Sequence, residues 1–256
     1  MSNENADFVY GINAVEAILE QRASSVEALY LGGKRDDKRH NNLIRAAQAS
    51  NVNISRVDAQ AFERLLVQAG LDAASVHQQV LARVRPAEVQ DENFLKTLLK
   101  RLEVPALLLV LDGVTDPHNL GACMRSANAA GAQAVVVPRD NAVHLTAAVR
   151  KVASGAAELT PLVVVKNLAR CIESLQQAGV WVMGAAGGTG QSLYQLDLTV
   201  HTALVLGAEG AGLRRLTRER CDALFEIPMA GEVESLNVSV AAGVSLFEAL
   251  RQRRFL

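Results

Sequence analysis

The chain has 256 residues, of which 50% are hydrophobic and 4% aromatic, and its formal net charge is -1. This length accommodates one large domain, or a medium domain with a small one, and the aliphatic composition favours a parallel sheet covered by helices. The near-neutral charge argues against a basic tail that binds polyanions, because non-specific affinity for nucleic acid comes mainly from Lys and Arg. It does not exclude a local basic patch.

The three cysteines, Cys123, Cys171 and Cys221, are far apart and form no CxxC motif. The sequence therefore predicts neither a disulfide framework nor a metal site, and a reduced, cytoplasmic setting fits. The first residues show no basic stretch followed by an apolar one, so no signal peptide is expected. The longest apolar run, Val104–Leu111, is too short to span a bilayer, and no membrane partner is expected.

Residues 1–84 alternate between helical and extended patterns, which predicts a small α/β domain. The expected helices are Gly11–Gln21, Leu43–Ala49 and Ala59–Ala69, and the expected strands are Val26–Leu31, Asn53–Val57 and Val76–Val84. Between two of these elements lies the charged stretch Lys34–His40. A solvated turn is the favoured interpretation, and the stretch is the first candidate for phosphate contact if the protein handles RNA.

Residues 85–92 contain a proline, several charges and few apolar residues, so we place a linker there, with a second domain at residues 93–256. An amphipathic helix at Phe94–Leu102 opens this second domain. The expected strands are Ala106–Leu111, Ala134–Pro138, Leu162–Val165, Val180–Ala185, Ala203–Leu206 and Leu224–Ile227. The expected helices are Leu120–Ala130, Ala147–Ala153, Leu168–Ala178, Leu213–Cys221 and Leu236–Arg253. Continuous apolar strands indicate a mostly parallel sheet buried on both faces, which binds ligands beyond its carboxyl ends.

The first loop with candidate chemistry, Asp112–Ala127, follows a buried strand. Its Asp116-Pro117 pair predicts a turn, Asn119 can cap the next helix, and Arg125 falls on that helix's second turn. Arginine is rarely buried without a partner, so Arg125 in an otherwise small and apolar helix predicts either a surface salt bridge or a functional role.

Two more loops follow later strands. The segment Gly207–Gly212 is glycine-rich, which permits a close ligand approach, and its Glu209 can hold an amine or a ribose hydroxyl, or cap a helix. The segment Phe225–Ala242 contains a proline, a glycine-containing loop and a helix that opens on Ser235 and Asn237. This pattern indicates either a small-molecule site or an ordinary strand, loop and capped helix without a binding role.

Taken together and in this order, the three loops resemble the signature motifs of the SpoU (TrmH-like) branch of the SPOUT RNA methyltransferases. The segments Tyr10–Val15 and Val76–Gln78 are similar to the L30e-like substrate-binding domain of the same enzymes. Gln79 stands where relatives usually have glycine, a departure that concerns RNA docking rather than methyl transfer. The subfamily nearest in pattern methylates the 2'-oxygen of a guanosine in large-subunit (23S) ribosomal RNA.

The resemblance implies an α/β fold with a C-terminal trefoil knot that holds S-adenosylmethionine, an exception to the rule that chains do not thread loops. It implies a homodimer packed through the knotted domain, with a site that can include groups from both chains. The implied cofactor-binding residues are Gly207, Ile227, Leu236, Gly210 and Met229. The implied catalytic residues are Arg125, Asn119, Glu209, Ser235 and Asn237.

Two roles for Arg125 are open at this point. Family proposals make the arginine a general base, but a guanidinium is effectively always protonated. Electrostatic stabilisation of the forming alkoxide, with anchoring of a phosphate, suits its charge better. Asn119, Ser235 and Asn237 are expected to orient the ribose.

An arginine cluster follows the glycine-rich loop, at Arg214, Arg215, Arg218 and Arg220. On a helix, residues 214 and 218 share one face, so part of the cluster can bind phosphate while the rest pairs with Glu219 and Asp222. A solvated charged face is the alternative interpretation.

Rival functions remain for the chain as a whole. Gly184–Gly190 suggests a Rossmann-type nucleotide site, but no helix pattern follows it directly, so a surface turn is favoured. A ribosome-associated RNA-binding protein without catalysis is the alternative from another class, and the intact motifs count against it. Methylation of tRNA or of another rRNA site is the alternative within the family, since such enzymes share the three motifs.

Overall fold

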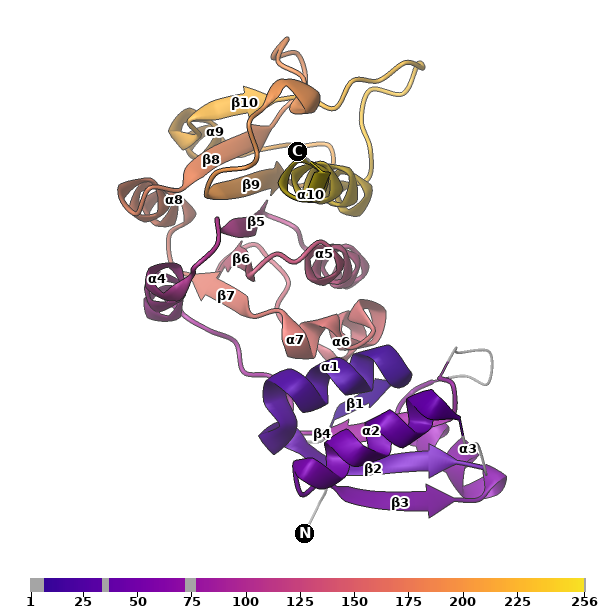
Figure 1. Cartoon of the computed structure of the whole chain (residues 1–256). Coiled ribbons are helices and arrows are strands. Elements are labelled where there is room, and N and C mark those ends of the chain that lie inside the picture. Colours follow the sequence, from indigo (N-terminus) through magenta and orange to yellow (C-terminus); the bar gives the residue numbers. More distant parts are fainter. Residues whose placement is uncertain (1–6, 34–36, 72–76, 256) are drawn as a thin grey trace. The chain divides into compact units, whose positions relative to one another are not determined.

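The computed structural model describes residues 7–33, 37–71 and 77–255, and the chain divides into two compact units (Figure 1). The first unit comprises the chain up to Ala87 together with Ser154–Leu159, and the second comprises Glu88–Ala153 and the chain from Thr160 onward. Lys34, Arg35 and Asp36 of the charged stretch, and Val76 of the expected strand, lie outside the described residues.

The first unit is a four-stranded sheet with helices. Its elements are β1 (Asp7–Tyr10), α1 (Ile12–Arg22), η1 (Ala23–Ser25), β2 (Val26–Gly32), α2 (Lys38–Ala49), β3 (Asn53–Val57), α3 (Ala59–Gln68), β4 (Val80–Val84) and the short α7 (Ala156–Leu159). The strand order is β1-β4-β2-β3, antiparallel except for the parallel pair β2 and β3. Apolar residues of α1, such as Val15 and Ile18, are fully buried, as its helical spacing predicts.

The structure corrects two element boundaries in this unit and adds one strand. Helix α2 begins at Lys38 rather than Leu43, because the Asp37 side chain accepts hydrogen bonds from the backbone N–H groups of residues 39 and 40 and so caps it. The end of the charged stretch is therefore helix and not loop, and these bonds lower the pKa of the Asp37 carboxyl. Strand β4 begins at Val80 rather than Val76, and β1 is a strand that the sequence pattern did not reveal.

Gln78 and Gln79 both adopt positive φ, 52° and 60° respectively, in the turn before β4. A side chain with a Cβ is strained there by roughly 1–2 kcal/mol. Gln79→Gly is expected to stabilise the first unit by about 0.5–1 kcal/mol, measured by native-state hydrogen exchange of the β4 amides. Gln78→Gly is the control. The Gln78 Oε1 atom accepts a hydrogen bond from Ile12 N at 3.0 Å, so the loss of this bond offsets the relief of backbone strain. Equal stabilisation by both variants would contradict this account.

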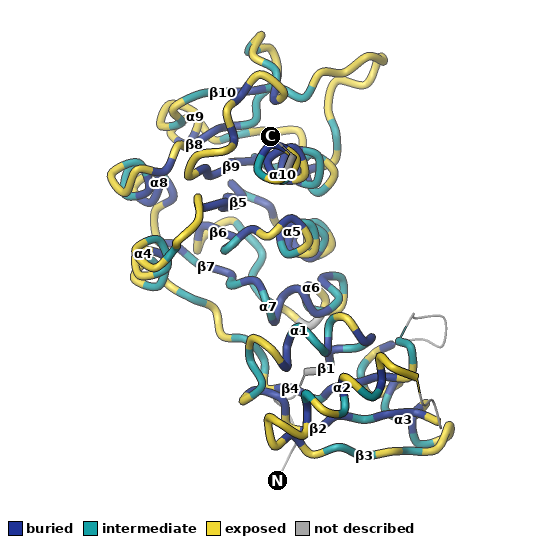
Figure 2. The backbone as a smooth tube through the Cα atoms, in the orientation of Figure 1, coloured by how far each residue is buried: buried dark blue, intermediate teal, exposed yellow. Residues whose placement is uncertain are grey.

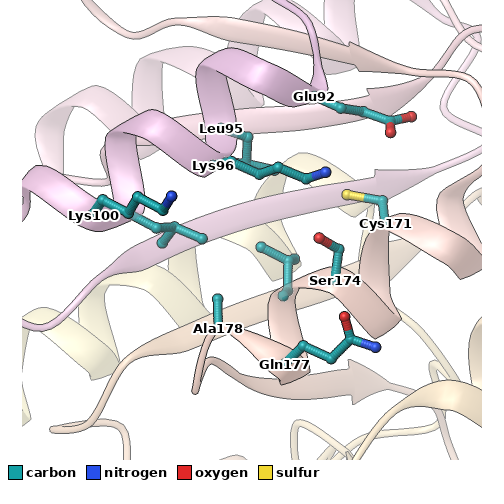
Figure 3. Close-up of a pocket in the computed structure, with 10 residues that line it drawn as sticks. Glu92, Leu95, Lys96, Lys100, Cys171, Ser174, Gln177 and Ala178 are labelled. Carbon is teal, nitrogen blue, oxygen red and sulfur yellow. The ribbon is translucent and has the colours of Figure 1, made fainter.

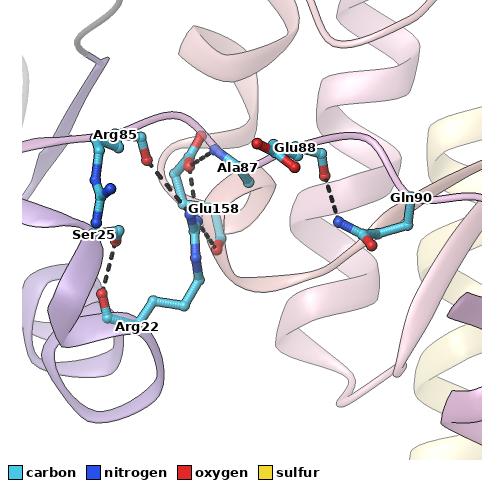
Figure 4. Close-up of polar contacts among 7 residues, drawn as sticks. All are labelled: Arg22, Ser25, Arg85, Ala87, Glu88, Gln90 and Glu158. Carbon is cyan, nitrogen blue, oxygen red and sulfur yellow. Dashed lines mark hydrogen bonds and ion pairs between the residues drawn. The ribbon is translucent and has the colours of Figure 1, made fainter.

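Glu158 of α7 is hydrogen-bonded both to Arg22, at the end of α1, and to Ala87, within the expected linker (Figure 4). Its buried carboxylate accepts from the Arg22 guanidinium at 3.0 Å and from the backbone N–H of Ala87 at 2.6 Å. Arg85 N donates to Ser25 O at 2.8 Å in the same region. The start of the expected linker is thus fastened by hydrogen bonds within the first unit.

The second unit is a six-stranded, wholly parallel sheet in the order β10-β8-β9-β5-β6-β7. Its strands are β5 (Leu107–Asp112), β6 (Ala134–Pro138), β7 (Leu162–Val165), β8 (Trp181–Ala185), β9 (Thr202–Gly207) and β10 (Ala223–Phe225). Its helices are α4 (Glu92–Arg101), α5 (Pro117–Ala129), α6 (Ala147–Ala153), α8 (Leu168–Gln177), α9 (Arg215–Arg220), α10 (Val238–Phe255) and the short η2 (Leu193–Gln195). Figure 1 shows α4 and α8 on one face of the sheet and α5 and α10 on the other.

Strands β5 and β6 of this sheet are buried along their whole length, as Figure 2 shows. The prediction of a mostly parallel sheet buried on both faces is therefore confirmed. Burial of Cys123 and Cys171 in this unit raises the pKa of each thiol to about 12, so both stay protonated at neutral pH.

The chain after β10 passes from the edge of the sheet back to its centre. Strand β10 lies at the edge beside β8, whereas α10, which follows it, packs against α5 and β9. Residues 226–237 therefore return past the carboxyl ends of β8 and β9. This return brings the third loop beside the second.

Candidate functional site

A cavity of about 400 Å³ opens at the carboxyl ends of β8, β9 and β10. All five expected cofactor-binding residues line it: Gly207, Gly210, Ile227, Met229 and Leu236. Glu209 and Ser235 line it as well. Its position beyond the strand ends is where parallel α/β sheets bind ligands.

At Gly207 the cavity wall has no room for a side chain. A Cβ at this position would lie 2.0 Å from the carbonyl carbon of Gly212 and 2.4 Å from Leu213 N, so only glycine fits. The turn is closed by the bond from Gly212 N to Ala208 O at 2.8 Å, and Gly210 and Gly212 have φ of 75° and 65°. The loop therefore presents backbone groups to a ligand at close range.

One polar cluster joins the three loops, although its members are far apart in the sequence. Asn119 Nδ2 donates to Glu209 Oε1 at 3.2 Å, and Asn237 Nδ2 donates to Asn119 Oδ1 at 3.0 Å. Asn237 Nδ2 also donates to Glu209 Oε1. These side chains are exposed or half-buried, so their remaining polar atoms can reach the hydroxyls of a ribose.

Two helix starts near the cluster differ from the predicted ones. Helix α5 is capped by Asp116, whose side chain accepts from His118 N at 3.1 Å, and not by Asn119. Helix α10 begins at Val238 rather than Leu236, and Asn237 Oδ1 accepts from Ser239 N at 2.9 Å. Because Asp116 performs the capping of α5, Asn119 is free to bond Glu209.

Arg125 and Ser235 stand apart from the polar cluster. Arg125 is exposed on α5, and within the described residues it neither lines the cavity nor forms an ion pair, so the surface salt bridge is not seen. Ser235 is exposed at the cavity wall. The roles of both residues stay predictions.

Asp112 fastens the glycine-rich loop to the centre of the sheet. Its fully buried carboxylate accepts from Arg214 N at 2.9 Å and from Arg214 Nε at 2.5 Å, just after the loop ends. The same residue pairs in register with Gly207 across the β5–β9 ladder. Both ends of the loop are thus held at one strand end, which limits its conformations.

The remaining arginines of the cluster are largely engaged in ion pairs. Arg215 pairs with Glu219 at 2.8 Å, as expected, and Arg220 pairs with Glu173. The expected pairing with Asp222 is wrong, because this carboxylate instead accepts from Gln176 and from the backbone of Val182. Arg218 is exposed.

The interpretation of Gly184–Gly190 as a surface turn missed part of the site. Ala185, Ala186 and Gly187 line the cavity, and the segment leads into the short η2 rather than a helix, which excludes the Rossmann arrangement. Glu226 also lines the cavity, and its carboxylate accepts from Thr189 N at 3.1 Å. The glycine content of the segment was the available signal.

The described residues contain no group of three or more His, Cys, Asp or Glu side chains arranged to hold a metal ion. None of the helices within the same ranges has the length and apolar character needed to cross a membrane.

Comparison with known proteins identifies the class. Residues 106–247 match the model of the SpoU rRNA Methylase family, and residues 8–90 match a model described as RNA 2'-O ribose methyltransferase substrate binding. The chain belongs to the SpoU rRNA methylase family.

Curated relatives match almost from end to end. A 23S rRNA (guanosine-2'-O-)-methyltransferase RlmB from Pseudomonas syringae pv. tomato is 55% identical over 96% of this chain and 95% of its own length. The protein of the same name from Escherichia coli K12 is 49% identical over 97% of this chain and 99% of its own length.

Two solved structures extend the comparison. The SpoU methyltransferase AviRb from Streptomyces viridochromogenes, crystallised with the cofactor AdoMet, has a TM-score of 0.68 and 26% identity over 97% of this chain and 91% of its own. A second solved structure concerns the 2-OH methylation of C/U34 on tRNA. It is 30% identical to this chain with a TM-score of 0.53, and the match covers 58% of this chain and 96% of the other.

Proposed function

We propose that this protein methylates the ribose 2'-oxygen of a guanosine in 23S ribosomal RNA with S-adenosylmethionine as methyl donor. The observation that carries the proposal is the polar cluster of Asn119, Glu209 and Asn237, whose Glu209 lines the cavity. The end-to-end similarity to the relatives named above supports the rRNA guanosine as target.

The cavity has the features that such a cofactor needs. Close-packed glycine backbone at Gly207, the apolar side chains of Ile227 and Leu236, and the Glu209 carboxylate offer contacts for an adenine, a ribose and a cationic centre. S-adenosylmethionine, when bound, supplies a methyl group that is already activated for transfer.

The protein's own contribution is then alignment and electrostatics. Asn119, Ser235 and Asn237 hold the acceptor ribose, and fixed positioning of this kind is worth as much as roughly 7–11 kcal/mol in well-oriented reactions. Arg125 supplies a permanent positive charge that anchors a phosphate and stabilises the alkoxide as the 2'-hydroxyl loses its proton.

We assign residues 1–84 to RNA substrate binding and residues 93–256 to catalysis, with residues 85–92 as the linker. The two family-model matches, at 8–90 and 106–247, support this division of labour. A cytoplasmic location suits both the free thiols and a ribosomal RNA substrate.

We further propose a homodimer that packs through the second unit. Helix α10 carries an exposed apolar stripe, in which Val240 is 50% and Phe247 49% exposed and Val244 lies between them at helical spacing. A second copy that covers this stripe would also bring its own Arg125, on the adjacent α5, to the interface region.

The dimer has a direct test. A Val240→Arg/Phe247→Arg variant is expected to be monomeric in sedimentation velocity, because two buried charges without partners oppose association, and to lose methyl transfer. Val104→Arg is the control, since this exposed residue lies outside α10 and should leave the dimer intact. A monomeric wild-type protein, or a dimeric double variant, would contradict the proposal.

Methylation of tRNA is the second candidate, favoured by the similarity to the solved structure that concerns 2-OH methylation on tRNA. That structure spans 58% of this chain, whereas the rRNA-directed relatives span the substrate-binding region as well. The full-length similarity therefore favours rRNA.

The function is tested by transfer from labelled S-adenosylmethionine to unmodified large-subunit rRNA, small-subunit rRNA and tRNA in separate reactions. One labelled 2'-O-methylguanosine in large-subunit rRNA, mapped by resistance to alkaline cleavage, is the expected result. Label in tRNA alone would establish the second candidate, and cofactor binding without transfer to any RNA would contradict free RNA as substrate.

A further inference from the structure

A second cavity, of about 450 Å³, lies in the same unit at the carboxyl ends of β6 and β7. Its walls come from Pro138, from residues 166–169 at the start of α8, and from Arg214–Thr217 at the start of α9. None of these residues lines the cavity beside β8, β9 and β10. It is a separate site at the same edge of the sheet.

Positive charge dominates this cavity. Lys166 is exposed, and its ammonium group forms no ion pair within the described residues. Among the described residues, the Arg215 guanidinium pairs with Glu219 alone. With side chains 75% and 53% exposed this pair is worth about 0–1 kcal/mol, so the guanidinium is available to a ligand. Asp140 is the acidic residue of the lining, and Arg139 offsets its charge at 3.6 Å.

Arg214 has a different place in the cavity. The buried Asp112 neutralises it and fixes its backbone, so it forms a rigid wall rather than a free cation. The first backbone N–H groups of α8 add partial positive charge at the same wall, since Asn167 caps only the N–H of Arg170. Leu216, 50% exposed, supplies an apolar surface next to these groups.

A cationic rim around an apolar surface matches a phosphate with its attached nucleoside. Neighbouring strands lie ~4.8 Å apart, so the ends of β6 and β7 lie roughly 5–10 Å from the end of β5, where the Asn119 loop begins. An RNA strand with its target ribose at the polar cluster can therefore reach this cavity within a few nucleotides.

We propose that the cavity formed by Lys166, Arg215 and Leu216 beside the Asp112–Arg214 pair binds a phosphate and nucleoside of the substrate RNA that flank the methylated nucleotide. The inference rests on the proposed function and adds to it a second RNA subsite, outside the methyl-transfer cluster. A free nucleotide offers the same phosphate chemistry, so the experiment separates the two sources.

The test compares two double variants that each remove two positive charges from the second unit. The Lys166→Ala/Arg215→Ala variant removes both positively charged side chains that the proposed subsite offers to a phosphate. Lys96→Ala/Lys100→Ala is the control, because these lysines border a different groove, between α4 and α8 (Figure 3). All four side chains are exposed, so both variants should fold.

Binding of a large-subunit rRNA transcript is measured across a range of salt concentrations. The Lys166/Arg215 variant is expected to bind at least about 10-fold more weakly than wild type, with the slope of log K against log salt smaller by about one, since one phosphate contact is lost. In turnover the loss should appear in KM for RNA rather than in kcat. The Lys96/Lys100 variant should show the wild-type slope.

Two further readouts keep the outcomes distinct. Equal slopes in both variants, or wild-type RNA affinity in the Lys166/Arg215 variant, would overturn the subsite. Guanosine monophosphate that binds wild type and not this variant, with unchanged RNA affinity, would overturn it in favour of a free nucleotide. RNA binding is measured independently of methyl transfer. An inactive wild-type enzyme would therefore refute the proposed function, whereas the RNA affinities of the two double variants would still test the subsite.

Discussion

Replacing Arg125 with alanine is expected to lower kcat for methyl transfer by about 10²–10³-fold, while cofactor affinity stays at the wild-type value. The loss follows from removing a fixed positive charge where the 2'-oxygen becomes negative. Cofactor affinity is spared because Arg125 does not line the cavity. Turnover is measured with labelled cofactor and saturating RNA, and affinity by calorimetry.

Conservative and distant substitutions sharpen this prediction. Arg125→Lys keeps the charge but loses the planar guanidinium, so an intermediate rate is expected. Arg101→Ala, an exposed arginine at the end of α4, is the control and should have wild-type kcat. Near-wild-type turnover in Arg125→Ala would refute both the electrostatic and the general-base role.

The same residue tests whether the dimer shares its sites. If Arg125 serves the partner's cavity, mixing Arg125→Ala with Glu209→Gln protomers should restore activity, because each mixed dimer then contains one intact site. Activity that stays at the level of the separate variants would place Arg125 and Glu209 in the same protomer's site.

Replacing Gly207 with alanine is expected to weaken cofactor binding by at least about 100-fold, or about 2.7 kcal/mol. The added Cβ would lie 2.0 Å from the Gly212 carbonyl carbon, a distance that only a shift of the loop backbone can relieve. The shifted loop would carry Glu209 away from Asn119 and Asn237, so methyl transfer should be lost as well. Calorimetric titration with S-adenosylmethionine measures the first effect.

Gly187→Ala provides a matched control in the same cavity. Gly187 also lines the cavity, but a Cβ there would meet no atom within 4 Å, so the same substitution should preserve binding. Wild-type affinity in Gly207→Ala would show that the loop can rearrange and that its close packing is not required. Equal loss in both variants would indicate that any added methyl group blocks the ligand.

Sequence patterns predicted the elements of the second unit closely. The strands at Ala134–Pro138 and Leu162–Val165 and the helix at Ala147–Ala153 match the structure residue for residue. The reason is physical: strands buried on both faces must be continuously apolar, and such runs are visible without the fold. Helix starts were less predictable, because Asp37 and Asp116 cap through hydrogen bonds that periodicity does not show.

The sequence by itself determined the order of the motifs and the residue types available for chemistry, since these depend only on neighbours along the chain. Tertiary structure decided which of them meet. Asn119 and Glu209 meet because β5 and β9 are neighbours in the sheet, and Asn237 joins them because the chain returns past β8 and β9. Arg214, one of the arginines considered for phosphate contact, pairs with Asp112, which lies 102 residues away. Contacts at such separations arise from the packing of the sheet, and no local pattern encodes them.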